Sequence, residues 1–288
     1  MTMSKYAKMM DLTGKVAVVT GAGGILCSKM AEALADQGAS VALLDLRPDA
    51  AETVAAAIRA RGGKALAVAC NVLELESINA AVKTVQDAFG VCDILVNGAG
   101  GNNKKATTDF ERMSADDFKK KSAESVSFFD LDADAVRFVF NLNFLGTLLP
   151  TQGFVKPMLE AGKPGVVINV SSMNAFTPLT KIPAYSAAKA AVSNFTQWLA
   201  THFAPANIRV NAIAPGFFLT DQNRFLLTKE DGSMTPRGQL IINGTPMKRY
   251  GEADELLGAL LWLSCDLSSF VTGIVVPVDG GFSAFSGV

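Results

Sequence analysis

A tyrosine and a lysine four positions apart form the most informative chemical pattern in the sequence. At this spacing Tyr185 and Lys189 share one face of a helix, so the ammonium can lie beside the phenol. A free phenol has a pKa of about 10, and a nearby cation would lower that pKa towards neutrality. Ser172 lies thirteen positions before Tyr185, at the end of an apolar run, and its hydroxyl could hydrogen-bond a substrate oxygen. The three residues together predict proton transfer to or from an alcohol or a carbonyl.

A glycine-rich turn near the start of the chain predicts a second functional element. It joins the apolar run Val16–Thr20 to an Ala-rich helical pattern. Small residues in such a turn let backbone N–H groups approach a pyrophosphate at the start of the helix. The alternative is a tight turn that only requires positive φ angles. The residues that would contact the pyrophosphate are Gly21, Gly23, Gly24, Ile25 and Leu26.

An acidic residue ends the next apolar run. Asp45 can accept hydrogen bonds from both ribose hydroxyls of a dinucleotide, and its charge repels a 2′-phosphate. This position therefore favours NAD over NADP. Arg47 keeps NADP as an alternative, because its guanidinium could pair with that phosphate. Asp45 could instead be a simple turn or helix-capping aspartate.

The elements that must position these residues alternate between short apolar runs and longer helical patterns. Near-continuous apolar strands between helices indicate a parallel sheet covered on both faces. We therefore expect one α/β domain over residues 1–288, a doubly wound (Rossmann-type) sheet of about seven parallel strands with helices on both faces. The expected strands are Val16–Thr20, Val41–Asp45, Ala65–Cys70, Asp93–Asn97, Gly165–Ser171, Ile208–Ile213 and Gly273–Val278. The expected helices are Ile25–Gln37, Ala50–Arg61, Ser77–Phe89, Ala133–Leu149, Ala184–Phe203 and Ala253–Ser264.

Composition excludes several functional classes. Hydrophobic residues make up 49% of the chain and charged residues 18%, which is enough apolar material for a large core. A net charge of −1 offers no basic surface for nucleic acid or an anionic membrane. One histidine and four cysteines without a CxxC pair predict no metal site and no disulfide framework. Without a signal core or an apolar run of about 18 residues, we expect a cytoplasmic protein with no membrane contact.

The complete set of motifs resembles the short-chain dehydrogenase/reductase family. That family carries Ser, twelve residues, Tyr, three residues and Lys, as in Ser172, Tyr185 and Lys189. The resemblance runs from about residue 12 to 281, nearly the whole chain. Four further landmarks occur in order: Asn97-Gly98-Ala99-Gly100 for Asn-Asn-Ala-Gly, Asn143-Phe144-Leu145-Gly146 for Asn-Leu-x-Gly, Pro215-Gly216 with Thr220, and Asp279-Gly280-Gly281.

The resemblance implies an oxidoreductase that uses NAD, with NADP as the alternative. Tyr185 would be the acid or base, Lys189 would bind the nicotinamide ribose, and Asn143 would hold a water that links Lys189 to solvent. Family members usually form tetramers, so we expect a homo-oligomer, a tetramer or a dimer. The implied catalytic residues are Asn143, Ser172, Tyr185 and Lys189. The implied cofactor contacts are Gly21, Gly23, Gly24, Ile25, Leu26, Asp45, Asn71, Val72, Asn97, Gly98, Ala99, Tyr185, Lys189, Pro215, Gly216 and Thr220.

The sequence departs from the family pattern at two cofactor positions. In the family's Thr-Gly-x-x-x-Gly-x-Gly turn, Gly24 falls one place early and Cys27 replaces the last glycine. The family's aspartate near the adenine appears as Asn71, whose amide oxygen can still accept a hydrogen bond. These changes could weaken cofactor affinity, but they keep the turn.

Several segments also resemble one branch of the family, the D-mannonate oxidoreductases (fructuronate reductases). They are the glycine turn and the stretches 97–102, 171–176 and 215–219. This resemblance implies NADH-dependent reduction of D-fructuronate to D-mannonate. The alternatives are another keto-gluconate or polyol dehydrogenase, and a cofactor-binding regulator without catalysis.

Two polar segments interrupt the regular alternation, a polar insert at 101–131 and a substrate loop at 220–251. Both follow the carboxyl ends of expected strands, where ligands bind in doubly wound sheets. A sugar acid needs donors for its carboxylate and hydroxyls, and amide or cationic side chains would supply them. The expected substrate contacts are Asn102, Lys104, Ser172, Asn174, Gln222 and Arg224.

Overall fold

Seven parallel strands form one sheet in the computed structural model, which describes residues 4–219, 227–229 and 231–287. The strand order is β3-β2-β1-β4-β5-β6-β7, so the expected doubly wound sheet is confirmed. The chain reverses direction across the sheet between β3 and β4, which creates the switch point beside β1 where ligands bind in this architecture. The strands are β1 (Val16–Thr20), β2 (Ser40–Asp45), β3 (Lys64–Ala69), β4 (Ile94–Asn97), β5 (Gly165–Val170), β6 (Ile208–Pro215) and β7 (Val275–Val278).

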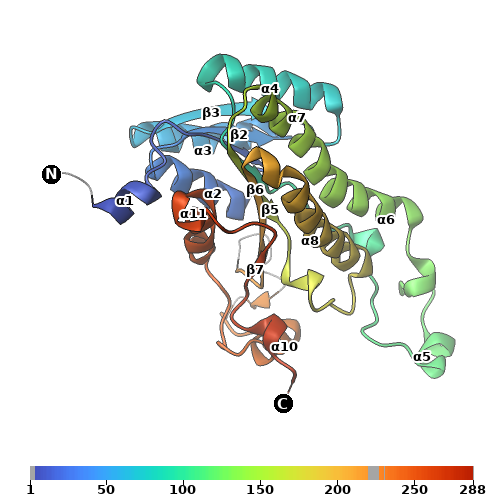
Figure 1. Ribbon diagram of the computed structural model, residues 1–288. Coiled ribbons are helices and arrows are strands. Elements are labelled where there is room, and N and C mark those ends of the chain that lie inside the picture. Colours follow the sequence, from blue (N-terminus) through green and yellow to red (C-terminus); the bar gives the residue numbers. More distant parts are fainter. Residues whose placement is uncertain (1–3, 220–226, 230, 288) are drawn as a thin grey trace.

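Helices cover both faces of the sheet (Figure 1). One face carries α2 (Ile25–Asp36), α3 (Pro48–Ala60) and α11 (Leu257–Ser264), and the other carries α4 (Leu75–Phe89), α7 (Gly146–Glu160) and α8 (Pro183–Phe203). Alternate residues of β1 belong to opposite cores: Ala17 and Val19 pack with the first set of helices, and Val18 packs with the second. Each fully buried aliphatic side chain contributes about 1.5–3 kcal/mol, which explains why every residue of β1 is apolar except its last.

Strand register brings distant motifs to one edge of the sheet. Thr20, the last residue of β1, is paired with Asn97 at the end of β4, and Asn97 is paired with Asn169 near the end of β5. The segments that leave these three strands carry the glycine turn, the 98–101 segment and Ser172. The sheet therefore assembles the predicted cofactor and catalytic motifs at its carboxyl edge.

The helix expected over Ala133–Leu149 is interrupted. The chain forms α6 (Ala133–Phe140), a π-helical turn (Asn141–Leu145) and then α7, which extends to Glu160. Asn143 Nδ2 donates to the carbonyl of Val139, 2.8 Å away, and so occupies an acceptor that a regular helix would use for a backbone N–H. The sequence periodicity did not reveal this turn because an asparagine fits a helical pattern.

The segments outside the repeating pattern contain helices that the sequence did not predict. The insert at 101–131 includes the short helix α5 (Ala115–Lys120), which lies away from the sheet (Figure 1). The loop at 220–251 includes α10 (Pro236–Gly244), and α1 (Lys5–Met10) precedes the first strand. None of the helices in the described part of the chain is both long and apolar enough to cross a membrane.

Candidate active site

A cleft of about 400 Å³ lies at the carboxyl edge of the sheet and joins the glycine turn to the Tyr-Lys pair. It collects residues at or just after the ends of β1, β2, β4, β5 and β6, together with the first two turns of α8. Twelve of the predicted site residues line it: Gly21, Gly24, Ile25, Leu26, Asp45, Gly98, Ala99, Ser172, Tyr185, Lys189, Pro215 and Gly216.

The glycine turn has the shape and polarity that a pyrophosphate requires. Gly21 has φ +67°, and a Cβ there would lie 2.9 Å from the Cα of Ala99, so only glycine fits. Helix α2 starts after Gly24 without a side-chain cap and without an acidic residue in its first turn. The N–H groups of that turn and the positive end of the helix dipole could therefore bind an anion in the cleft without competition from a side chain.

The Asp45 carboxylate is held at the edge of the cleft by backbone donors. Its Oδ2 accepts from the Gly23 N–H at 2.9 Å, and its Oδ1 accepts from the Arg47 N–H at 2.9 Å. The Nε of Arg47 lies 3.6 Å from the same Oδ1. Gly23 does not line the cleft but fixes this carboxylate. Each carboxylate oxygen keeps a lone pair for a ribose hydroxyl, so the residues present fit a dinucleotide.

Ser172 and Tyr185 meet on the opposite side of the cleft. Ser172 is the second residue after the end of β5. It is 7% exposed, and its side chain is hydrogen-bonded to Tyr185. Burial raises the pKa of Tyr185 above its usual value, and the hydrogen bond to Ser172 opposes that rise. The pKa of Tyr185 is thus raised in this structure and not lowered as the sequence predicts, because burial of the phenol has a larger effect than the hydrogen bond to Ser172.

Lys189 is buried beside the tyrosine. Its Nζ lies 5.7 Å from the centroid of the Tyr185 ring and donates to the carbonyl of Val170 at 2.7 Å. Burial lowers the pKa of Lys189 to about 8. Ser171, which no sequence motif indicated, has its Oγ 2.7 Å from that of Ser193 and donates to the Lys189 carbonyl at 3.2 Å. It joins the end of β5 to the helical turn that carries the lysine.

Asn143 lies behind the cleft wall and does not line the cleft. Its Nδ2 donates to the Gly101 carbonyl at 2.7 Å, and its Oδ1 accepts from the Gly101 N–H at 3.3 Å. A Cβ on Gly100 would lie 2.7 Å from Asn143 Oδ1 and 3.2 Å from Lys189 Nζ. Asn143 therefore fixes the 100–101 backbone against the lysine, and its proposed water contact stays a prediction.

Besides Gly23, three expected cofactor contacts among the described residues do not line the cleft, so their contact with a cofactor stays a prediction. The amide of Asn71 closes its own loop: Oδ1 accepts from the Leu73 N–H at 3.1 Å, and Nδ2 donates to Glu74 at 2.7 Å. Val72 packs beside Gly146. Asn97 is buried, and its Nδ2 donates to Thr151 and Asn169, both at 2.9 Å.

The expected substrate contacts are mostly dispersed. Asn102 donates to Thr107 at 3.1 Å, and Lys104 is exposed in a short 3₁₀ turn of the insert. Asn174 is 5% exposed, and its Oδ1 is a buried acceptor without a hydrogen bond. Thr220, Gln222 and Arg224 lie outside the described residues. The other lining residues, which were not predicted as site residues, are Cys27, Arg47, Gly100, Gly101, Val170 and Ser171.

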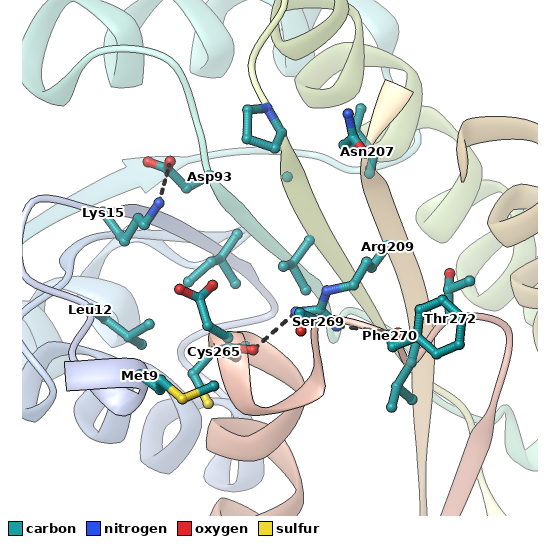
Figure 2. A pocket seen from close by; sticks show the side chains of 18 of the residues that line it. Met9, Leu12, Lys15, Asp93, Asn207, Arg209, Cys265, Ser269, Phe270 and Thr272 are labelled. Carbon is teal, nitrogen blue, oxygen red and sulfur yellow. Dashed lines mark hydrogen bonds and ion pairs between the residues drawn. The ribbon is translucent and has the colours of Figure 1, made fainter. Parts of the chain in front are cut away.

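A larger cavity, of about 550 Å³, opens at the opposite, amino edge of the sheet (Figure 2). Charged side chains that line it are engaged in contacts within the protein. Lys15 Nζ forms an ion pair with Asp93 Oδ1 at 3.6 Å, and Asp93 Oδ2 accepts a hydrogen bond from the Val16 N–H at 2.8 Å. Arg209 donates to loop carbonyls that include those of Leu263 and Cys265, at 2.9 and 3.2 Å. We therefore place the active site at the carboxyl edge.

Comparison with known proteins agrees with this geometry. Residues 15–231 match the family model described as short chain dehydrogenase. The chain is 57% identical over 280 residues to an uncharacterised oxidoreductase of Haemophilus influenzae, covering 96% of each chain. It is 51% identical to the uncharacterised oxidoreductase UxuB of Bacillus subtilis, covering 96% of this chain and 98% of that one. A crystal structure of a candidate D-mannonate oxidoreductase from Haemophilus influenza, with bound NAD, has a TM-score of 0.92 and 55% identity and covers 99% of this chain and 100% of that one.

Proposed function

The chain belongs to the short chain dehydrogenase family, and from this premise we propose that it reduces the sugar acid D-fructuronate to D-mannonate with NADH. Membership makes it an NAD(P)-dependent oxidoreductase that acts on CH–OH groups. The observation that carries the proposal is the single cleft in which Ser172, Tyr185 and Lys189 face the glycine turn and Asp45. The substrate is supported by the likeness to the candidate D-mannonate oxidoreductase.

Two parts of the cleft would hold the cofactor. The first turn of α2 would bind the pyrophosphate, and Asp45 would accept hydrogen bonds from the adenine-side ribose. The bound nicotinamide supplies or accepts the hydride. Lys189, whose ammonium is held at the end of β5, would bind the second ribose.

Side chains on the other side of the cleft would transfer the proton and bind the substrate oxygen. In the reducing direction, the Tyr185 hydroxyl donates its proton to the substrate oxygen as the carbonyl becomes an alcohol. Ser172, already hydrogen-bonded to Tyr185, donates a hydrogen bond to the same oxygen and stabilises the negative charge that develops there. Asn143 holds the 100–101 backbone in place behind them.

A panel of keto acids tests the substrate. The purified protein is given NADH and, in separate assays, D-fructuronate, 5-keto-gluconate or neutral D-fructose, and absorbance at 340 nm is followed. We expect kcat/KM to be about 100-fold higher for fructuronate than for fructose, because a carboxylate bound by charged donors contributes about 1.5–3 kcal/mol. A higher value for 5-keto-gluconate would favour the alternative sugar-acid dehydrogenase, and turnover of neither acid would refute the proposal.

Cofactor preference is a separate prediction. Asp45→Ser should lower kcat/KM for NADH by about 10- to 100-fold and raise that for NADPH, because the variant loses the ribose acceptor and the charge that repels a 2′-phosphate. Arg47 would then be free to pair with the phosphate. The control is Asp49→Ser, an exposed position in the first turn of α3. An unchanged ratio of NADH to NADPH activity in Asp45→Ser would show that another residue selects the cofactor.

A homo-oligomer remains the prediction for assembly.

A further inference from the structure

Two residues from different βα units pack directly against each other in the floor of the cleft. Cys27 lies in the first turn of α2, and Gly98 immediately follows β4. A Cβ on Gly98 would lie 2.2 Å from Cys27 Sγ and 2.8 Å from the carbonyl oxygen of Thr20. Gly98 is not among the glycines with positive φ. Space, and not backbone conformation, therefore requires glycine at position 98.

The segment that contains Gly98 forms one wall of the cleft. The N–H groups of Gly98 and Ala99 both donate to Thr20 Oγ1, at 3.0 and 3.2 Å. Ala99 in turn approaches the glycine turn so closely that Gly21 cannot carry a Cβ. The glycine turn forms the facing wall of the cleft. The distance between it and the 98–101 segment thus depends on how closely Gly98 packs against Cys27.

The thiol contributes shape and not reactivity. Cys27 is 6% exposed, and burial raises the pKa of its thiol to about 12. A neutral, buried sulfur behaves as a compact apolar group that fills space. Its neighbours in the cleft include Lys189, so a change in its size is felt close to the catalytic side chains.

The two positions are also among those at which this sequence departs from its family's motifs. Cys27 has a side chain where the turn usually has glycine, and Gly98 has none where the motif usually has asparagine. We propose that Cys27 and Gly98 are a size-matched pair. In this pair Cys27 is the positioning residue: its side chain sets the distance between the 98–101 segment and the glycine turn, and so the fit of the dinucleotide between them. This inference rests on the proposed cofactor site.

A double-mutant cycle tests the pair. The Kd for NADH is measured by fluorescence titration for the wild type, Cys27→Ala, Gly98→Ala and the double variant. We expect Gly98→Ala to raise Kd about tenfold or more, because its Cβ collides with Sγ and lifts the wall. Cys27→Ala should reverse most of that loss, since the nearest remaining Cys27 atom, Cβ, is 3.6 Å away. The contact with the Thr20 oxygen should keep the rescue incomplete.

Two controls make the result specific. Cys92→Ala replaces another buried cysteine, which lies two residues before the start of β4, whereas Gly98 follows its end. This substitution should not rescue Gly98→Ala. The loss in Gly98→Ala should appear in the KM for NADH more than in kcat. Additive effects on Kd would overturn the pair. So would a fall in melting temperature with Kd unchanged, which is the result of a purely structural role. A wild type that does not bind NADH would instead refute the proposed function.

Discussion

Tyr185→Phe should lower kcat by about 10²- to 10⁴-fold while the Kd for NADH stays close to the wild-type value. The substitution removes only the hydroxyl, which is the group hydrogen-bonded to Ser172, and keeps the ring that packs with Ala184 and Ala188. Without that hydroxyl the substrate oxygen loses its proton donor, and Ser172 alone cannot replace it because a serine hydroxyl is a much weaker acid. Stopped-flow single-turnover assays and fluorescence titration separate the chemical step from cofactor binding.

Tyr250→Phe is the matched control. Tyr250 is also buried, at 8% exposed, but its hydroxyl donates to the Gly238 carbonyl at 3.2 Å, away from the residues that line the cleft. Its loss should affect stability and not kcat. Turnover by Tyr185→Phe at the wild-type rate would remove the proposed chemistry. A wild type that binds NADH but reduces none of the carbonyls would support the alternative of a cofactor-binding regulator.

The parts of the fold that could be predicted are those in which one local pattern decides the structure. The apolar runs of β1 and β5 permit no other placement than the interior of a sheet, and the strand–turn–helix sequence around Gly21 fixes the start of α2. Because parallel strands end at one edge, the sequence also predicts that Asp45 and Ser172 share a cleft, and both line it.

The remaining features depend on contacts that sequence spacing does not encode. The π-helical turn at Asn143 arises from two side-chain hydrogen bonds, one of which reaches Gly101, 42 residues away. The closeness of Cys27 to Gly98 depends on how α2 and β4 pack. The net rise in the Tyr185 pKa depends on how completely the tertiary structure excludes water from the phenol. Spacing on a helix indicated the lysine beside the tyrosine but not the burial that raises the pKa of the phenol.

The same burial makes Lys189 costly to the fold, which leads to a second large effect. Lys189→Met should abolish turnover and also change how stability depends on pH. Lys189 is 4% exposed, and burial lowers its pKa from 10.5 to about 8. Between these values the unfolded chain binds more protons than the folded one, so the free energy of unfolding of the wild type rises with pH. Methionine keeps the length of the side chain but cannot titrate, so the variant lacks this rise.

We expect the wild type to gain about 2 kcal/mol over Lys189→Met between pH 7.5 and pH 9.5, measured by urea unfolding at both pH values. Groups that titrate alike in both proteins cancel in this difference. Lys83→Met replaces a lysine whose side chain is 76% exposed on α4 and should follow the wild-type curve. Parallel pH curves for the wild type and Lys189→Met would mean that the ammonium is solvated in solution and that burial does not shift its pKa. If the expected difference appears, the fold bears a cost in stability to keep a cation beside Tyr185, and such a cost is expected where a charge serves chemistry rather than folding.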